Sequence, residues 1–172
     1  FNKYVQKVLQ TNPTYSDLYF TLAENCVSVR LYKEAVGFAR EALKINPRDW
    51  KTMSLLGVNL LRIGEEQQGR EMLEQAYEGN KFNVWTVNTL TLLDSYVNFE
   101  RYETPHFKVM LHKKEAAALR PYVTELLEKA YKDLSSKYGF TPETPIGFEM
   151  YPDHADFAVR TLGLPGLSAL GV

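Results

Sequence analysis

Cysteine is nearly absent from the chain, and neither sign of charge predominates. Cys26 is the single cysteine, so no disulfide bond can form within the chain. The 20 Lys and Arg residues are balanced by 21 Asp and Glu residues, which excludes the basic composition typical of nucleic-acid-binding proteins. No apolar run approaches the roughly 20 residues that a membrane-spanning helix needs. We therefore expect neither a nucleic-acid partner nor a membrane span.

Composition is that of a folded protein. The 172 residues are 45% hydrophobic and 13% aromatic, which is enough for one domain or two small ones with packed cores. The chain begins at Phe1 and stops at Val172 in an apolar stretch, so we expect a piece of a longer parent protein. Such a piece would not show a signal peptide. The compartment stays open between export, for instance to a bacterial periplasm, and the cytoplasm.

The first half of the chain repeats with a period of 34 residues, the separation of Pro13 and Pro47. Apolar residues at helical spacing predict one helix over residues 17–30, with Ser16 as its N-cap, and a second over residues 33–45. Because a residue before proline is pushed out of helical geometry, the second helix is expected to end before Pro47.

The next 34 residues repeat this pattern at the positions where paired helices would touch. Small residues there let the two helices of a hairpin approach closely. The aligned pairs are Tyr19 and Met53, Leu22 and Leu56, Ala23 and Gly57, Cys26 and Leu60, Ala35 and Gly69, Ala39 and Leu73, and Ala42 and Ala76. We divide the region into a partial repeat over residues 1–15, repeats over 16–49 and 50–83, and a final helix over 84–98.

This region resembles the tetratricopeptide repeat, most specifically in the segment Tyr32-Lys33-Glu34-Ala35 followed by residues 42–47, Ala-Leu-Lys-Ile-Asn-Pro. The second repeat departs from the pattern at its end, where Lys81 replaces the expected proline. The resemblance implies a helical solenoid that binds a protein or peptide on a concave face formed by its first helices.

In that family, four positions of each first helix line the concave face. They correspond here to Asp17, Phe20, Glu24, Val27, Lys51, Ser54, Val58, Leu61, Trp85, Asn88, Leu92 and Ser95. Only Asn88 fits the family's clamp for a terminal carboxylate, so an acidic chaperone tail is not expected as the ligand. Alternatively, the repeats act as a spacer, or these side chains pack against a neighbouring segment.

The pattern changes after Tyr96. Alternating apolar residues predict strands over residues 107–112 and 146–150, with the polar face of the first holding His106, Lys108, Met110 and His112. Residues 114–138 read as a long helix that Pro121 either kinks or divides. Its apolar face comprises Leu119, Val123, Leu126, Leu127, Ala130, Tyr131 and Leu134.

A shorter helix is predicted over residues 154–162, capped by Asp153, with a further strand at residues 170–172. The order is strand, helix, strand, helix and a third strand. So few strands indicate part of a larger α/β or α+β domain.

Residues 104–172 resemble the opening part of peptidase-MA-like domains, which are zinc-dependent and of the gluzincin type. The matching pieces are the first strand, the long helix ending in Lys137-Tyr138-Gly139, and the block from Tyr151 to Gly166. The resemblance implies a His-Glu-x-x-His zinc helix beyond this region, and peptide hydrolysis by the longer parent protein through a zinc-bound water.

The sequence contains no His-Glu-x-x-His, so we assign no catalytic, metal-binding or cofactor-binding residue, and Zn²⁺ is implied only for the parent. His106 and His112 are about 20 Å apart along a strand, too far to share one ion. His154 lies between Asp153 and Asp156, where capping and solvation explain it better than a metal. Cys26 occupies a packing position and is expected to be a buried thiol.

We therefore predict a mainly α protein, with helical hairpins over residues 1–98 followed by a partial α/β segment over residues 104–172. The predicted function is an interaction module joined to the start of a metallopeptidase-like domain that is inactive by itself. Two alternatives stay open: a scaffold whose α/β segment only caps the solenoid, and a degenerate peptidase that has lost its zinc ligands.

Overall fold

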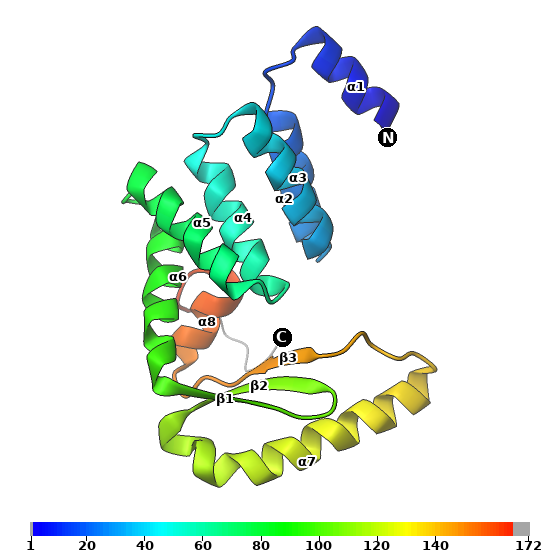
Figure 1. Cartoon of the computed structure of the whole chain (residues 1–172), viewed down its shortest axis with the longest axis vertical. Helices are drawn as coiled ribbons and strands as arrows, with labels where there is room; N and C mark the ends of the chain where they lie inside the picture. Colours follow the sequence, from blue (N-terminus) through cyan, green and yellow to red (C-terminus); the bar gives the residue numbers. More distant parts are fainter. Residues whose placement is uncertain (1, 167–172) are drawn as a thin grey trace. The chain divides into compact units, whose positions relative to one another are not determined.

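The fold comprises helical hairpins followed by a small three-stranded sheet with its own helices, as seen in a computed structural model that describes residues 2–166 (Figure 1). The predicted fold class, mainly α with a small α/β segment after the helices, is confirmed. The chain divides into two compact units, Phe1–Thr91 and Leu92–Val172. The division falls within a helix, whereas the sequence placed it between residues 98 and 104.

The first unit contains α1 (Asn2–Thr11), α2 (Asp17–Ser28), α3 (Tyr32–Ile45), α4 (Trp50–Arg62), α5 (Glu66–Gly79) and the start of α6 (Val84–Ser95). α2 ends two residues earlier than expected, because Arg30 has a φ of 62° and turns the chain into α3. The prediction for Ser16 is wrong in one respect. This residue precedes α2, but its side chain makes no capping hydrogen bond.

Two later caps keep the 34-residue period. Asp49 precedes α4, and its carboxylate accepts hydrogen bonds from the Thr52 amide at 3.3 Å and the Thr52 hydroxyl at 2.5 Å. Asn83 precedes α6, and its Oδ1 accepts from the amides of Trp85 at 3.1 Å and Thr86 at 3.3 Å. These bonds satisfy amide groups that have no partner within the helix, so they fix where each first helix begins.

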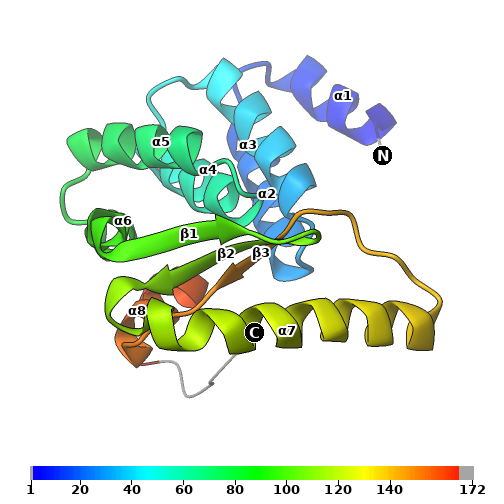
Figure 2. The ribbon, with the colours of Figure 1, turned by 60° about the horizontal axis from the view of Figure 1, so that its bottom comes forward.

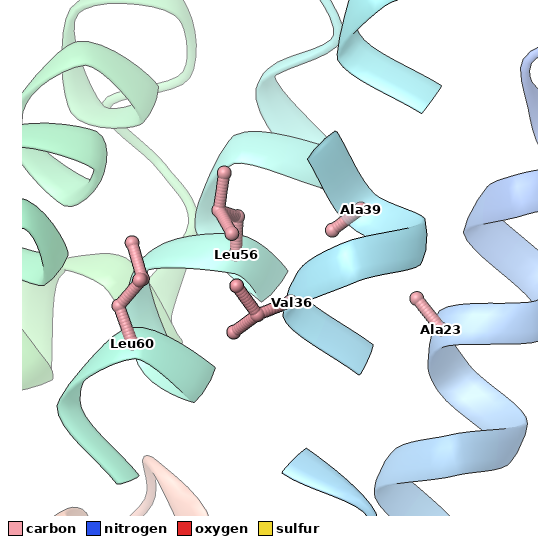
Figure 3. Close-up of a cluster of buried hydrophobic side chains, with 5 residues drawn as sticks. All are labelled: Ala23, Val36, Ala39, Leu56 and Leu60. Atoms are coloured by element: carbon pink, nitrogen blue, oxygen red, sulfur yellow. The ribbon is translucent and has the colours of Figure 1, made fainter. Parts of the chain in front are cut away.

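The core of the first unit lies between successive hairpins. Figure 3 shows its buried members, Ala23, Val36, Ala39, Leu56 and Leu60. The helices of the second hairpin meet through glycines at the predicted small-residue positions. A Cβ added at Gly57 would lie 2.9 Å from the Gly69 carbonyl oxygen and 2.7 Å from Cγ of the fully buried Leu73. Gly57 and Gly69 are thus required for α4 and α5 to pack this closely.

The second unit holds a three-stranded sheet in the order β1 (Phe99–Glu103), β2 (Phe107–His112) and β3 (Ile146–Glu149), reached from α6 through the 3₁₀ turn Tyr96–Asn98. β1 and β2 are antiparallel, whereas β2 and β3 are parallel and are joined by a helical crossover, α7 (Lys113–Tyr138) (Figure 2). The sequence analysis missed β1. In this charged edge strand, Phe99 alone is buried, so no apolar alternation reveals it.

One face of the sheet packs on α7, as predicted. Phe107, Val109 and Leu111 form a buried cluster with Ala116, and half-buried residues of α7 and β3 pack against it. α7 is a single helix through Pro121 and ends at Gly139, which has the left-handed conformation that favours glycine. Two residues predicted on its apolar face, Leu126 and Leu134, are instead exposed.

The other face of the sheet packs on α8 (His154–Leu162), whose bounds match the prediction (Figure 1). Asp153 caps α8 as expected, accepting a hydrogen bond from the Ala155 amide at 2.8 Å. Met110 was predicted on a polar face, but it is buried beside Glu149, which pairs with Arg160 of α8. The further strand predicted at residues 170–172 lies outside the described residues.

Candidate functional site

The positions expected to line a concave face include several buried side chains. The Lys51 ammonium lies 3.7 Å from the centre of the Phe20 ring, and the Ser54 hydroxyl is hydrogen-bonded to that of Thr86 at 2.8 Å. Such contacts stabilise the packing of successive first helices, and the residues making them have little surface left for a ligand. The buried members of the predicted face are Phe20, Ser54, Leu61 and Leu92.

The accessible members recur with the period of the repeat. Asp17, Lys51 and Trp85 are successive residues 34 apart, they occupy the first turns of α2, α4 and α6, and all three are exposed. Glu24 is also exposed, one further turn along α2. The remaining members are half-buried: Val27, Val58, Asn88 and Ser95. A ligand could therefore contact an acidic, a basic and an aromatic side chain in turn.

Trp85 is the most conspicuous of these side chains, with 52% of its surface exposed. Its backbone is held on both sides, because its amide donates to the Asn83 cap at 3.1 Å and its carbonyl accepts from the Thr89 hydroxyl at 2.7 Å. A fixed backbone presenting a large, partly apolar ring is a feature typical of protein-binding surfaces.

Cys26 is half-buried rather than fully buried as predicted. Burial raises the pKa of its thiol, and the negative charge of Glu34 adds to the effect. Since the thiolate is the reactive form, this environment opposes nucleophilic chemistry.

The three histidines occupy three different settings. The Nδ1 atom of His112 accepts a hydrogen bond from the Lys114 amide at 3.2 Å, and the His154 ring lies 6.1 Å from that of Phe157. His106 was predicted on the same strand face as His112, but it precedes β2 and stacks on Tyr131 of α7 with 3.8 Å between ring centroids. Among residues 2–166, no three His, Cys, Asp or Glu side chains are grouped to hold a metal ion. The described residues thus do not fit a catalytic zinc site.

Glu128 of α7 gathers the polar groups around His106. Its Oε1 accepts from the Thr104 hydroxyl at 2.5 Å and the His106 amide at 3.2 Å, and its Oε2 lies 2.6 Å from His106 Nδ1. The hydrogen bonds from Thr104 and then His106 hold the pKa of Glu128 below its usual value of 4.5. This carboxylate therefore ties the β1–β2 turn to α7 while it is ionised.

Thr104→Val should raise the pKa of Glu128, because the variant removes the largest interaction that favours the ionised form. The depressed pKa means that Glu128 stabilises the folded state above pH 4.5 and that this contribution is lost as pH falls through the folded pKa. A carbon-detected NMR titration of the Glu128 carboxyl group in both proteins measures the shift. An unchanged midpoint would show that the Thr104 hydrogen bond does not stabilise the ionised carboxylate.

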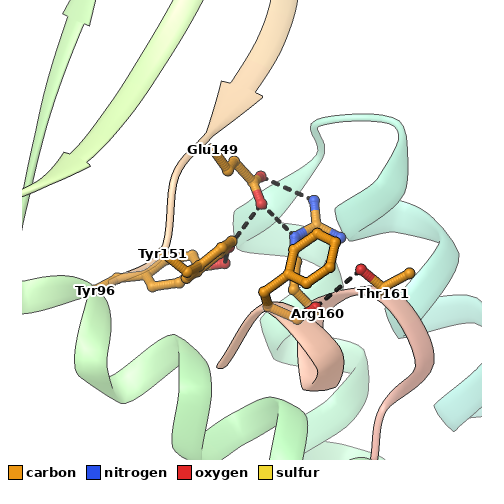
Figure 4. A network of polar contacts seen from close by, with 6 residues as sticks. Tyr96, Glu149, Tyr151, Arg160 and Thr161 are labelled. Atoms are coloured by element: carbon orange, nitrogen blue, oxygen red, sulfur yellow. Dashed lines mark hydrogen bonds and ion pairs between the residues drawn. The ribbon is translucent and has the colours of Figure 1, made fainter. Parts of the chain in front are cut away.

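A second polar network joins β3 to α8 (Figure 4). Arg160 donates two hydrogen bonds to Glu149, from Nε to Oε2 at 2.6 Å and from Nη2 to Oε1 at 2.9 Å. The Tyr151 hydroxyl donates to Glu149 at 2.7 Å and is hydrogen-bonded to the Tyr96 hydroxyl at 2.6 Å. The network thus links the turn after α6 with the last strand and the last helix of the second unit.

Electrostatics keep this network in one ionisation state near neutral pH. Burial opposes the charge on Glu149, but the hydrogen bonds and charge of Arg160 outweigh it and hold the pKa below 4.5. Burial, and then the charge of Glu149, raise the pKa of Tyr151 far above its ordinary range. None of these groups can exchange a proton at neutral pH, so the network is suited to joining elements rather than to acid–base catalysis.

Sequence reasoning did not identify either polar network. The available signals were the acidic Glu149 within an otherwise apolar strand and the arginine at the end of the short helix. Neither signal names its partner, because the pairing depends on which face of the sheet α8 covers.

Comparison with known proteins adds no family assignment. No protein-family model matches the chain, and a search of curated proteins finds no significant match. Within residues 2–166, no helix combines the length and hydrophobicity required to cross a lipid bilayer.

Proposed function

We propose that the helical hairpins bind a protein or peptide across the first turns of α2, α4 and α6. The observation that supports this proposal is the exposure of Asp17, Lys51 and Trp85 at a constant interval of 34 residues. Buried positions of the repeat are explained by packing, but packing does not account for an exposed tryptophan on a well-ordered helix.

The side chains indicate the chemistry of a suitable ligand. Trp85 offers apolar surface to a hydrophobic or aromatic side chain, Lys51 offers a charge to an acidic group, and Asp17 and Glu24 favour a basic one. A ligand of mixed charge that carries one apolar anchor fits this order better than a bare terminal carboxylate. We accordingly propose that the hairpins are tetratricopeptide repeats with a ligand class different from acidic chaperone tails.

Trp85→Ala and Lys51→Glu should each weaken peptide binding at least tenfold, a loss of about 1.4 kcal/mol. Ligands would be selected from a random-peptide display library on the intact chain, and the affinity of individual peptides measured by calorimetry. The physical reason is that each variant removes an anchor from the proposed face and leaves the core of the hairpins in place.

Matched controls separate this face from general surface effects. Phe82→Ala removes an aromatic ring that is 93% exposed but lies outside the first-helix positions. Lys44→Glu reverses a charge on α3, a second helix. We expect both controls to bind with unchanged affinity, and each variant is compared by its unfolding midpoint because Lys51 also covers Phe20. Equal losses in variants and controls, or no selected peptide, would argue against the proposed face.

The peptidase resemblance leads to a narrower proposal. We propose that residues 104–166 form a folded part of such a domain and that the zinc ligands belong elsewhere in a longer parent protein. The described histidines are engaged separately, as above, so no hydrolytic step is assigned to them. Zinc titration of this chain by calorimetry should show no tight site, whereas a tight stoichiometric site would contradict this assignment.

A further inference from the structure

α7 carries an apolar ridge that nothing in the described part of the chain covers. Its members are spaced four residues apart and comprise Tyr122, Leu126, Ala130, Leu134 and Tyr138. Tyr122 is 74% exposed, Leu126 66%, Leu134 51% and Tyr138 70%. The inner face of the same helix is separate, because Leu119, Val123, Leu127 and Tyr131 already pack on the sheet. An exposed apolar patch of this size is typical of an interaction surface.

The ridge reads the same in both directions. Tyrosines form its two ends, leucines follow inward from each end, and Ala130 lies at its centre. A two-fold axis through Ala130 would place Tyr122 of one copy beside Tyr138 of the other, and likewise Leu126 beside Leu134. An interface between identical copies requires this self-complementarity, whereas a different partner would not.

The spacing of the ridge also fits a known way of packing two helices. Residues four apart form a ridge inclined to the helix axis, and two such ridges interdigitate when the axes cross at about −50°. The smallest side chain is best placed at the crossing point, where the helices approach most closely. Ala130 occupies that point in the palindrome.

The charges beside the ridge are complementary under the same symmetry. The neighbouring row of exposed residues is Glu125, Lys129, Asp133 and Lys137, which alternates in sign. Reversing this row about its midpoint brings Glu125 opposite Lys137 and Lys129 opposite Asp133. That midpoint lies one residue from Ala130, so the same antiparallel arrangement serves both rows.

We propose that this ridge is the interface of a homodimer, in which two copies of α7 cross antiparallel at Ala130. The proposal is independent of peptide binding by the hairpins, because all of its residues lie in the second unit. Burying two tyrosines and two leucines from each copy supplies the stabilisation, and the flanking charges fix the antiparallel direction.

Analytical ultracentrifugation of the intact chain tests the proposal. The wild-type protein should sediment with twice the monomer mass of 19.8 kDa, and the double variant Leu126→Lys and Leu134→Lys should sediment as a monomer. Val97→Lys is the matched control, because it charges an apolar side chain that is 72% exposed outside α7, and it should leave the dimer intact. Circular dichroism checks that the variants are folded.

Crosslinking tests the position of the two-fold axis. In a Cys26→Ser background, Ala130→Cys should be joined efficiently by a short bismaleimide, since the two thiols lie at the crossing point. Lys137→Cys should not, because its two copies would be about 20 Å apart along the helix axes. A monomeric wild type, a dimer that survives the double lysine variant, or equal crosslinking at both positions would overturn the proposal. The second of these results would indicate association elsewhere, for instance at a sheet edge.

Discussion

Leu73→Ala should lower the free energy of unfolding of the helical-hairpin unit by about 3 kcal/mol. Leu73 is fully buried on α5, where its Cγ faces the position that a side chain at Gly57 of α4 would occupy. Truncation removes buried apolar surface and leaves a cavity that the rigid helix pair cannot close. Both tryptophans, Trp50 and Trp85, lie in this unit, so urea unfolding followed by tryptophan fluorescence measures its stability.

A double-mutant cycle tests whether Gly57 and Leu73 act on the same contact. Gly57→Ala alone should cost about 1–3 kcal/mol, because its Cβ would lie 2.7 Å from Leu73 Cγ. In the double variant that clash is absent, so we expect the combined loss to be smaller than the sum by about 1 kcal/mol. The residual cost reflects the Gly69 carbonyl oxygen, which stays 2.9 Å from the added Cβ.

Val29→Ala is the control for the cycle, because Val29 is 63% exposed at the end of α2. Its effect should stay within about 0.5 kcal/mol. Strict additivity of Gly57→Ala and Leu73→Ala would contradict the close packing of α4 and α5 through these two residues.

Arg160→Met should destabilise the second unit by about 2–3 kcal/mol at neutral pH, because it leaves the Glu149 carboxylate without its counter-ion. The Arg160 side chain is only 18% exposed and that of Glu149 31%, so water compensates the lost bonds only in part. Hydrogen exchange at the amides of β2 measures the change, since neither tryptophan lies in this unit.

The loss caused by Arg160→Met should shrink as the solution is made acidic. In the wild type, the depressed pKa of Glu149 gives a stabilisation that is present above pH 4.5 and lost as pH falls through the folded pKa. In the variant, burial alone raises the pKa, so protonation relieves the unpaired charge. Arg70→Met, which removes an exposed ion pair to Glu74 at 2.8 Å, should cost at most about 0.5 kcal/mol. A pH-independent loss at Arg160 would contradict an electrostatic role.

Local signals predicted the elements that depend on local chemistry. The hairpins follow from small and apolar residues recurring every 34 positions, and α8 follows from the Asp153 cap and the glycine after Leu162. The apolar alternation of β2 likewise predicted the face that packs on α7. In each case the responsible contacts are within one element or between consecutive ones.

The errors arise where burial is decided by distant elements. β1 has no apolar alternation, because an edge strand with one buried residue needs none. Met110 and His106 were placed on a polar face, but α8 covers Met110 and α7 provides the ring and carboxylate that hold His106. Leu126 and Leu134 look like core residues in sequence, yet the sheet is too narrow to cover every apolar residue of α7.

The candidate site was predictable only as a set of positions. The period placed Asp17, Lys51 and Trp85 on equivalent first helices, but it could not show which neighbouring positions are buried. Phe20 and Ser54 had the same periodic assignment, and their contacts with Lys51 and Thr86 remove them from the accessible surface.

The most direct test of the interaction role is an NMR map of a selected peptide on the intact, isotope-labelled chain. We expect chemical-shift changes concentrated at the first turns of α2, α4 and α6, with the indole of Trp85 most affected and the amides around Asp17 and Lys51 following. Changes confined to other surfaces, such as the exposed face of α7, would contradict peptide recognition by the first helices.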